Sequence, residues 1–355
     1  MSLRPPPKVS VVMASYNHEA FVREAIESVL SQSYQDLELV ITDDGSSDGT
    51  AKVIQSVPDP RIRLYVFKEN QGACVAVNDA IARASGEYIA VLNSDDYFLP
   101  GKLERQVAFL EAHPEIGAVF GLPLFVDERG ARFHNRRNPF VGLFTDQNRS
   151  RIEWLRHFFY HGNSLCHPTI LIRKSCYDAV GLFDPLLMQL PDLDLWIRLC
   201  RKCEIYILPE QLTGFRILDR EKNTSAPNPE RLARAAWETN TVLEHFAGFS
   251  DGELQAILSG SRFLIEGRPL RIVLAMEALA LGKPGYKPFG LNLLRRCLME
   301  HPNAMPAGEY FQLVGRHDPF STEFFRREHQ WLKRSRFVSA LRQLYARLRA
   351  YNFGR

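Results

Sequence analysis

Residues 37–50 read LELVITDDGSSDGT, and this segment combines a strand, a turn and the start of a helix. Leu37–Thr42 is mostly apolar, which is typical of a strand buried inside a sheet. Two aspartates follow, and then a run of glycine, serine and aspartate whose residue types favour a turn. Helical spacing begins after Asp48, which can cap that helix. The segment therefore predicts a strand that carries two carboxylates to the edge of a sheet.

The same alternation of short apolar runs and amphipathic stretches occurs on both sides of this segment. It predicts further strands at residues 9–13, 61–67, 88–92, 116–126 and 169–173, and helices around 21–30, 73–84, 103–110, 151–160 and 192–202. Strands and helices that alternate in this way favour an α/β/α sandwich with a mixed, mostly parallel sheet. Parallel strands end at one edge, and ligands of open α/β sheets bind just outside it.

The pattern changes near residue 220. Strand periodicity stops there, and helical spacing dominates afterwards, for example at 232–246 and 254–264. We therefore predict a short flexible leader at 1–7, an α/β domain at 8–220 and a helical domain at 221–355. A chain of 355 residues has room for one large domain and one smaller one.

Composition excludes several classes of protein. The net charge is only +3, so nucleic acid is not an expected partner. No apolar run approaches the ~20 residues of a membrane span, and the first residues lack the apolar core of a secretory signal. Six scattered cysteines indicate reduced thiols and a cytoplasmic location. Cys200 and Cys203 have C-x-x-C spacing, but no second ligand pair accompanies them, so a metal knuckle is not predicted.

Polar residues follow three of the predicted strands, at 14–17, 43–46 and 93–96. Asp44 can accept an N–H of uracil, thymine or guanine. Asp96 can hold a hard divalent cation that bridges to a diphosphate, and Asp95 can then accept ribose hydroxyls. One isolated acidic pair is also typical of a solvated turn. Two such pairs at the same edge favour a binding site.

Two more aspartates lie in the first turn of the predicted helix at 192–202. The helix dipole stabilises carboxylates at that position without any catalytic role. Alternatively, Asp192 is a general base that reaches an acceptor hydroxyl. Asp194 remains a rival for the same role.

Taken together, these segments resemble family-2 inverting glycosyltransferases with the GT-A fold, over residues 8–217. The matching segments are 9–17 for the opening strand, 43–50 for nucleotide binding, 70–89 before the metal motif, 94–96 for the metal motif and 192–198 for the catalytic base. Each segment is weak alone, but their order and spacing are specific.

The resemblance implies a role for each matching position. A UDP-, dTDP- or GDP-linked sugar is the implied donor, and the implied residues around its base and ribose are Ala14, Tyr16, Asp44 and Asp95. Asp96 would hold Mn²⁺ or Mg²⁺ on the diphosphate, and Asp192 would deprotonate the acceptor. The implied acceptor is a glycan or a lipid-linked oligosaccharide, in the synthesis of a cell-envelope polysaccharide.

Several positions depart from the family pattern. Many relatives have an acid at Pro191, Asp at Asn93 and Arg at Val77, and a histidine that can touch the metal stands where this chain has Leu218. Because that arginine is absent, Arg216 is the candidate for the diphosphate. The processive Gln-x-x-Arg-Trp motif is also missing, which favours transfer of a single sugar.

The acceptor side is less defined. Asn163 and His167, near His161, are the candidates there, together with Asp194 and Trp196. The departures also motivate a second hypothesis, a retired GT-A module that binds nucleotide-sugar or glycan without turnover. A nucleotidyltransferase would need a glycine- and lysine-rich phosphate loop, which residues 15–18 do not form.

Residues 331–355 predict a basic amphipathic helix, since arginines and lysines alternate with an apolar seam and no acid occurs. Such a helix can lie on an anionic membrane surface, where a lipid-linked acceptor would be found. It can equally pack its seam onto other helices or a second subunit. Packing is slightly favoured, with peripheral membrane contact as the alternative.

Overall fold

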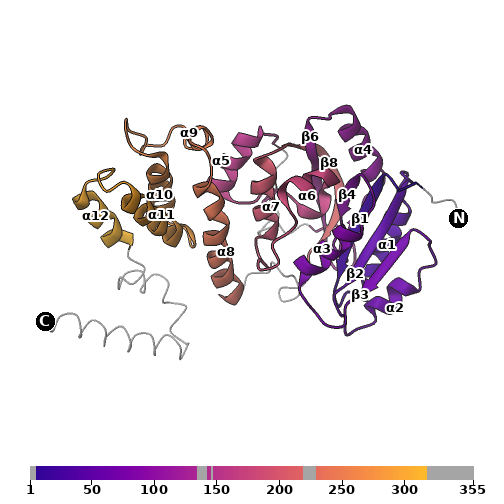
Figure 1. Cartoon of the computed structure of the whole chain (residues 1–355). Helices are drawn as coiled ribbons and strands as arrows, with labels where there is room; N and C mark the ends of the chain where they lie inside the picture. The colour runs from indigo at the N-terminus through magenta and orange to yellow at the C-terminus, as the bar shows by residue number, and fades with distance from the viewer. Residues whose placement is uncertain (1–4, 134–141, 145–146, 219–228, 318–355) are drawn as a thin grey trace, which may run out of the picture. The chain divides into compact units, whose positions relative to one another are not determined.

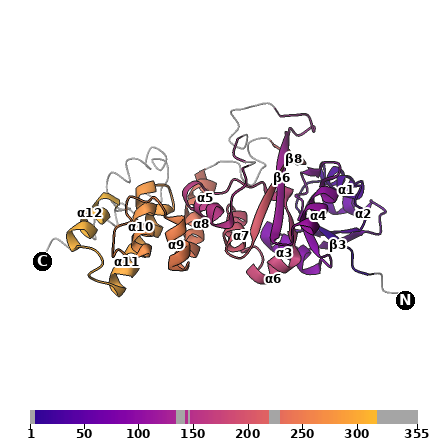
Figure 2. The same ribbon diagram turned by 90° about the horizontal axis from the view of Figure 1, so that it is seen from above.

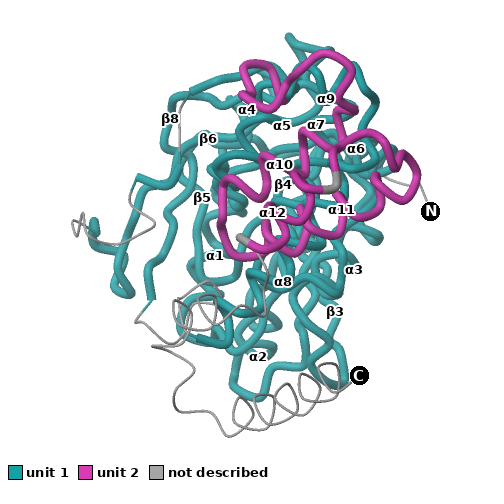
Figure 3. The backbone as a smooth tube through the Cα atoms, turned by 90° about the vertical axis from the view of Figure 1, so that its left-hand side faces the viewer, with its two compact units in different colours: residues 1–257 teal, residues 258–355 magenta. Residues whose placement is uncertain are grey.

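The structure is a computed structural model that describes residues 5–133, 142–144, 147–218 and 229–317. The predicted basic helix at 331–355 lies outside the described residues. The chain forms two compact units, residues 1–257 and 258–355 (Figure 3). The first unit includes α8 (Pro229–Ala247) and α9 (Asp251–Ile257), which the sequence pattern had placed in the helical domain.

The first unit is built on an eight-stranded sheet with the order β3-β2-β1-β4-β7-β6-β8-β5. The strands are β1 (Val9–Ser15), β2 (Leu37–Asp43), β3 (Ile62–Val66), β4 (Tyr88–Val91), β5 (Tyr97–Phe98), β6 (Ile116–Val126), β7 (Leu171–Arg173) and β8 (Glu204–Arg216). Strands β3, β2, β1 and β4 are parallel, as are β6 and β8 (Figure 1). β7 runs antiparallel to β4 and β6, and β5 to β8. The predicted mixed, mostly parallel sheet is confirmed.

Helices cover both faces of this sheet, as Figure 2 shows from above. They are α1 (Val22–Leu30), α2 (Thr50–Gln55), α3 (Ala73–Arg83), α4 (Lys102–Ala112), α5 (Arg151–His161), α6 (Lys174–Val180) and α7 (Pro191–Cys200). Val9, Val11 and Met13 of β1 join a buried core with apolar residues of α1 and α4. The opposite face of β1 and β2 contacts α3. This alternation follows from the period of two along a strand.

The longest strand, β8, was not predicted. Pro209 and Glu210 interrupt its apolar pattern, and its register with β6 is irregular for the same stretch. The pairing with β6 nevertheless forms nearly along its whole length, because β6 offers an apolar partner on the sheet. Elsewhere the boundaries shift slightly: a 3₁₀ turn at His167–Thr169 precedes β7, and α9 ends earlier than the predicted helix.

The ends of the parallel strands meet at one edge, as expected. Ser15 of β1 lies opposite Asp43 of β2, and β4 ends just before residues 93–96. Gly45 turns the chain after β2 with a φ of 67°, and a Cβ there would lie 2.7 Å from the backbone of Glu69. Glycine is therefore required for this turn.

The second unit contains α10 (Leu270–Leu281), α11 (Tyr286–Glu300) and α12 (Ala307–His317). α10 and α11 pack closely, since a Cβ on Gly290 would lie 2.8 Å from the carbonyl oxygen of Ala275. Arg268 forms an ion pair with Glu309 at 3.1 Å. Across the described residues, we find no helix with the length and apolarity that crossing a membrane requires.

Candidate active site

Asp96 lies at the carboxyl edge of the sheet, where two neighbouring segments hold its carboxylate. The backbone N–H of Arg216 donates to Oδ1 at 2.8 Å, and the Asn93 side chain donates to Oδ2 at 2.9 Å. Only 3% of Asp96 is exposed. The end of β8 thus fixes the predicted metal residue, a contact across 120 positions of the chain.

The two adjacent carboxylates are poorly solvated. Burial and the neighbouring charge of Asp95 raise the pKa of Asp96 well above its ordinary value. Burial also raises the pKa of Asp95. A divalent cation would relieve both effects, and carboxylate oxygens are the ligands that Mg²⁺ and Mn²⁺ accept. The described residues contain no group of three or more acidic, histidine or cysteine side chains that could hold a metal. Mg²⁺ sites that bridge to substrate phosphates often use only one or two protein carboxylates.

Arg216 is 2% exposed, and its guanidinium is directed to groups of the protein. It donates to the carbonyl oxygens of Asp95, Asp127 and Glu128 at 2.8–3.0 Å and pairs with Glu24. In this arrangement Arg216 supports the acidic pair, while the sequence pattern had placed it on the diphosphate.

Asp44 is 2% exposed and faces the chain after β3. Its two oxygens accept the backbone N–H groups of Gln71 and Gly72 at 2.7 and 2.9 Å. Each carboxylate oxygen keeps a further lone pair. Of the other predicted nucleotide contacts, Ala14 is partly buried, whereas Tyr16 is 44% exposed.

Asp192 stands in the first turn of α7, after Pro191 at the first helical position. The Asn163 side chain donates to its Oδ2 at 2.6 Å, and the Leu193 N–H donates to Oδ1 at 2.8 Å. Burial outweighs these bonds and raises the pKa of Asp192 to about 6. Burial raises the pKa of the Cys166 thiol well above its ordinary value, and the negative charges of Asp96 and Asp192 add to that shift.

Asp194 has a different environment from Asp192. It is 5% exposed, and its oxygens bind Arg198 at 2.6 Å and His245 of α8 at 2.6 Å. Although burial opposes the effect, these partners lower the pKa of Asp194. Asp194 is therefore held within an ion-pair cluster that links α7 to α8.

Two acceptor-side candidates, the buried Trp196 and the partly buried His167, pack against each other. Trp196 is fully buried and packs edge-on against Phe120 at 5.0 Å and against His167 at 5.9 Å. Burial lowers the pKa of His167 to about 4, and no hydrogen-bond partner for its Nε2 lies among the described residues. His167 thus lies edge-on to a core tryptophan.

Several residues around the site were not predicted. His18 Nδ1 and Ser94 Oγ share a hydrogen bond of 2.7 Å. It directly follows the strand end at 14–17, so the strand-end rule could have included it. The sequence around Glu24 and Glu238 does not indicate a role for either residue. The hydrogen-bond partner of Glu24 lies 192 positions away, and those of Glu238 lie about 50 positions away.

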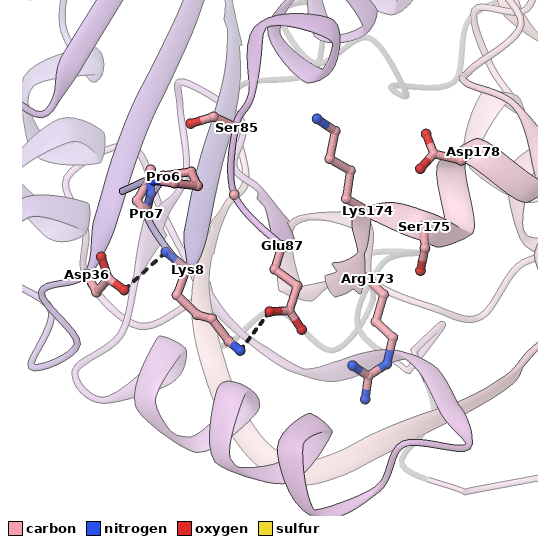
Figure 4. A pocket seen from close by; sticks show the side chains of 11 residues that line it. Pro6, Pro7, Lys8, Asp36, Ser85, Glu87, Arg173, Lys174, Ser175 and Asp178 are labelled. Atoms are coloured by element: carbon pink, nitrogen blue, oxygen red, sulfur yellow. Dashed lines mark hydrogen bonds and ion pairs between the residues drawn. The ribbon is translucent and has the colours of Figure 1, made fainter. Parts of the chain in front are cut away.

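A cavity of about 520 Å³ lies at the opposite edge of the sheet, near the start of β1 and β4 (Figure 4). Both of its lysines already have partners: Lys8 pairs with Glu87 at 2.7 Å, and Lys174 donates to the carbonyl oxygen of Ala84 at 2.7 Å. None of the predicted site residues lines it.

Sequence comparison with known proteins gives the family of this chain. Residues 10–174 match the family model described as glycosyl transferase family 2. A glycosyltransferase of Rickettsia prowazekii, RP339, is 30% identical over 293 residues, covering 79% of this chain and 81% of the relative. The chain belongs to glycosyltransferase family 2. The putative glycosyltransferase EpsE of Bacillus subtilis is 36% identical over 200 residues, 54% of this chain and 66% of EpsE.

Solved structures of this family-2 transferase's fold include TarS residues 1–349 of S. aureus in complex with UDP-GlcNAc. The TM-score is 0.57 at 17% identity, covering 79% of this chain and 83% of that one. The mannosyltransferase PcManGT of Pyrobaculum calidifontis, in complex with GDP-Man and Mn²⁺, gives 0.50 at 16% identity, with 94% and 90% covered. The likeness shows the GT-A fold, as the resemblance implied.

Proposed function

We propose that this family-2 glycosyltransferase moves one sugar from a nucleotide-diphosphate donor to a hydroxyl acceptor, with inversion and with Asp192 as general base. The observation that carries the proposal is the placement of Asp192 in the first turn of α7, where the Asn163 side chain donates to its Oδ2 at 2.6 Å. Burial raises the pKa of this carboxyl to about 6, toward the range that suits a general base. Asp194 is excluded from this role in the proposal, because Arg198 and His245 occupy its oxygens.

The donor side of the proposal rests on the edge formed by β1, β2 and β4. Asp44 would accept an N–H of the base, and Asp95 would accept ribose hydroxyls. Asp96 would hold Mn²⁺ or Mg²⁺, which when bound offsets the charge of the departing diphosphate. The relatives' ligands, UDP-GlcNAc in TarS and GDP-Man in PcManGT, agree with Asp44 being suited to both uracil and guanine.

The transfer step follows from the position of the base. Asp192 takes the proton of the acceptor hydroxyl, and the acceptor oxygen forms a bond to the anomeric carbon of the donor. The bond between that carbon and the diphosphate oxygen breaks, and its electron pair leaves with the nucleoside diphosphate. Asn163 keeps the carboxylate oriented during the step through its 2.6 Å hydrogen bond. Attack opposite to the leaving group inverts the anomeric configuration.

The first experiment is a thermal-shift screen of UDP, dTDP, GDP and CDP, each with Mn²⁺ or with EDTA. A ligand that binds only the native state raises the melting temperature by mass action. The proposal predicts stabilisation by one or two nucleotides with metal only. The matching donor is then tested for hydrolysis and transfer with wild type, Asp192→Asn, and Asp178→Asn as an exposed control of equal charge change.

Each result has a clear meaning. Metal-dependent binding with turnover that is lost in Asp192→Asn and kept in Asp178→Asn supports the proposal. Binding without turnover in wild type would instead support a retired module. Stabilisation by nucleotide in EDTA equal to that in Mn²⁺ would overturn the metal role of Asp96.

A further inference from the structure

Glu238 of α8 is fully buried, and its carboxylate is turned toward the chain that leads into α7. Oε1 accepts the Met188 N–H at 2.9 Å, and Oε2 accepts the N–H groups of Gln189 and Leu190 at 2.7 and 2.8 Å. These three consecutive amides lie in an irregular segment and form no part of a helix or strand. One carboxylate therefore accepts hydrogen bonds from three consecutive backbone N–H groups.

This carboxylate holds the chain immediately before α7. Leu190 is the N-cap residue of α7 and provides no side-chain hydrogen bond of its own. Glu238, about 50 positions later in the chain, binds the N–H of Leu190 and of the two residues before it. A negative charge at this end of a helix is also stabilised by the helix dipole. Asp192 lies two residues after Leu190.

The same segment is held from its other side by α3. Asn78 accepts the Phe183 N–H at 3.0 Å and donates to the Phe183 carbonyl at 2.7 Å, and Cys74 Sγ donates to the Leu187 carbonyl at 3.3 Å. Residues 183–190 are thus fixed between α3 and α8. If the contact with α8 were removed, residues 188–190, which lead into Asp192, would lose their hydrogen bonds to Glu238. The segment would then be held by α3 alone.

We infer that Glu238 is a positioning residue, which anchors the N-terminus of α7 and thereby sets the place of Asp192 relative to the acceptor. The inference rests on the proposed function in that it takes Asp192 as the base. It also makes α8 a required part of the catalytic unit, although α8 follows the segment that the family model matches.

Glu238 has an electrostatic effect as well as a structural one. Its negative charge adds to the burial that raises the pKa of Asp192. The other titratable groups near Asp192 are the thiols of Cys74 and Cys166, which burial keeps neutral by raising their pKa, and Asp194, which is ion-paired. Loss of the charge at 238 therefore moves the acid limb of the pH profile to lower pH, which a merely structural role would not do.

The test compares Glu238→Gln with Glu230→Gln, a control on the same helix at an exposed position. The Glu238→Gln side chain would turn an NH₂ group toward donors, so at least one of the three amides loses its acceptor. Hydrogen exchange of a peptide covering 186–193 is expected to become about 10-fold faster in Glu238→Gln and to stay unchanged in the control. kcat is expected to fall about 10-fold or more, while nucleotide affinity changes less than twofold.

The outcomes separate this inference from the proposed function. If Asp192→Asn transfers sugar as wild type does, the proposed base is wrong, whereas the exchange data still test the anchor. If Asp192→Asn is inactive and Glu238→Gln leaves amide exchange, kcat and the acid limb unchanged, the inference is overturned. If Glu238→Gln does not fold, wild-type exchange decides: unprotected amides at 188–190 would overturn the anchor, and Glu238→Asp then gives the kinetic comparison.

Discussion

The Asp192→Asn variant is expected to be inactive and yet more stable than wild type at neutral pH. Burial raises the pKa of Asp192 from 3.8 to about 6, so the folded protein holds an ionised carboxylate in a place that disfavours the charge. An amide of the same shape removes that charge. The variant therefore loses the general base, and it also loses the free-energy cost of holding an ionised carboxylate at this place in the folded protein.

The size of the effect follows from the two pKa values. A carboxyl whose folded pKa is raised destabilises the fold above that pKa, and this destabilisation fades as the pH falls toward the unfolded value. The penalty is about 3 kcal/mol at pH 7, falls to roughly half of that at pH 5 and to a small fraction of it at pH 4. The amide also loses about 1 kcal/mol, because one of its two atoms cannot accept the bond from Asn163 or Leu193.

The net gain is therefore about 2 kcal/mol at pH 7 and near zero between pH 4 and pH 5. For a unit of this size, 2 kcal/mol corresponds to a rise of about 4–8 °C in melting temperature. The assay is urea and thermal unfolding of both proteins from pH 4 to pH 8, with EDTA and no nucleotide. Asp178→Asn serves as the control and should show no pH-dependent difference. A variant that is less stable than wild type at pH 7, or a difference that does not change with pH, would refute the reasoning.

Three further predictions concern other parts of the first unit. Asp96→Asn should abolish the Mn²⁺-dependent rise in melting temperature with nucleotide, measured by thermal shift, while unliganded protein stays folded. His245→Ala should lower stability by about 1–3 kcal/mol in urea at pH 7, because the buried carboxylate of Asp194 loses a hydrogen-bond partner. Since the pKa of Asp194 is lowered, this loss should shrink as the pH falls below about 4. Cys203 should be alkylated by iodoacetamide faster than the buried thiols at pH 7, because a hydrogen bond from Cys176 lowers its pKa to about 7; equal rates by mass spectrometry would contradict this.

The acidic pairs at the sheet edge show what local pattern can establish. Asp44 and Asp96 each lie within a few residues of the end of an apolar strand, and the rule that parallel strands end together places them at one edge. The structure confirms that edge through the pairing of β1 with β2 and β4. Both steps need only a few neighbouring residues and the general chirality of α/β crossovers.

The choice between Asp192 and Asp194 shows where local pattern stops. Both aspartates lie in the same helical turn, so helix dipole and spacing treat them alike. The difference comes from side chains distant in sequence: Asn163 bonds Asp192, whereas His245 bonds Asp194. No window of sequence around 192–194 contains this information.

Local sequence pattern establishes the α/β class, the common edge of the strand ends and the segments that place carboxylates there, because periodicity and turn chemistry act over short distances. The tertiary structure decided the partners of those carboxylates: β8 brings Arg216 to Asp96, and α8 brings Glu238 to the start of α7. These contacts depend on chain segments that meet only after the sheet has formed. These contacts form because every buried charge and N–H group needs a hydrogen-bond partner. The local sequence shows that such a group is present, but it does not identify the partner.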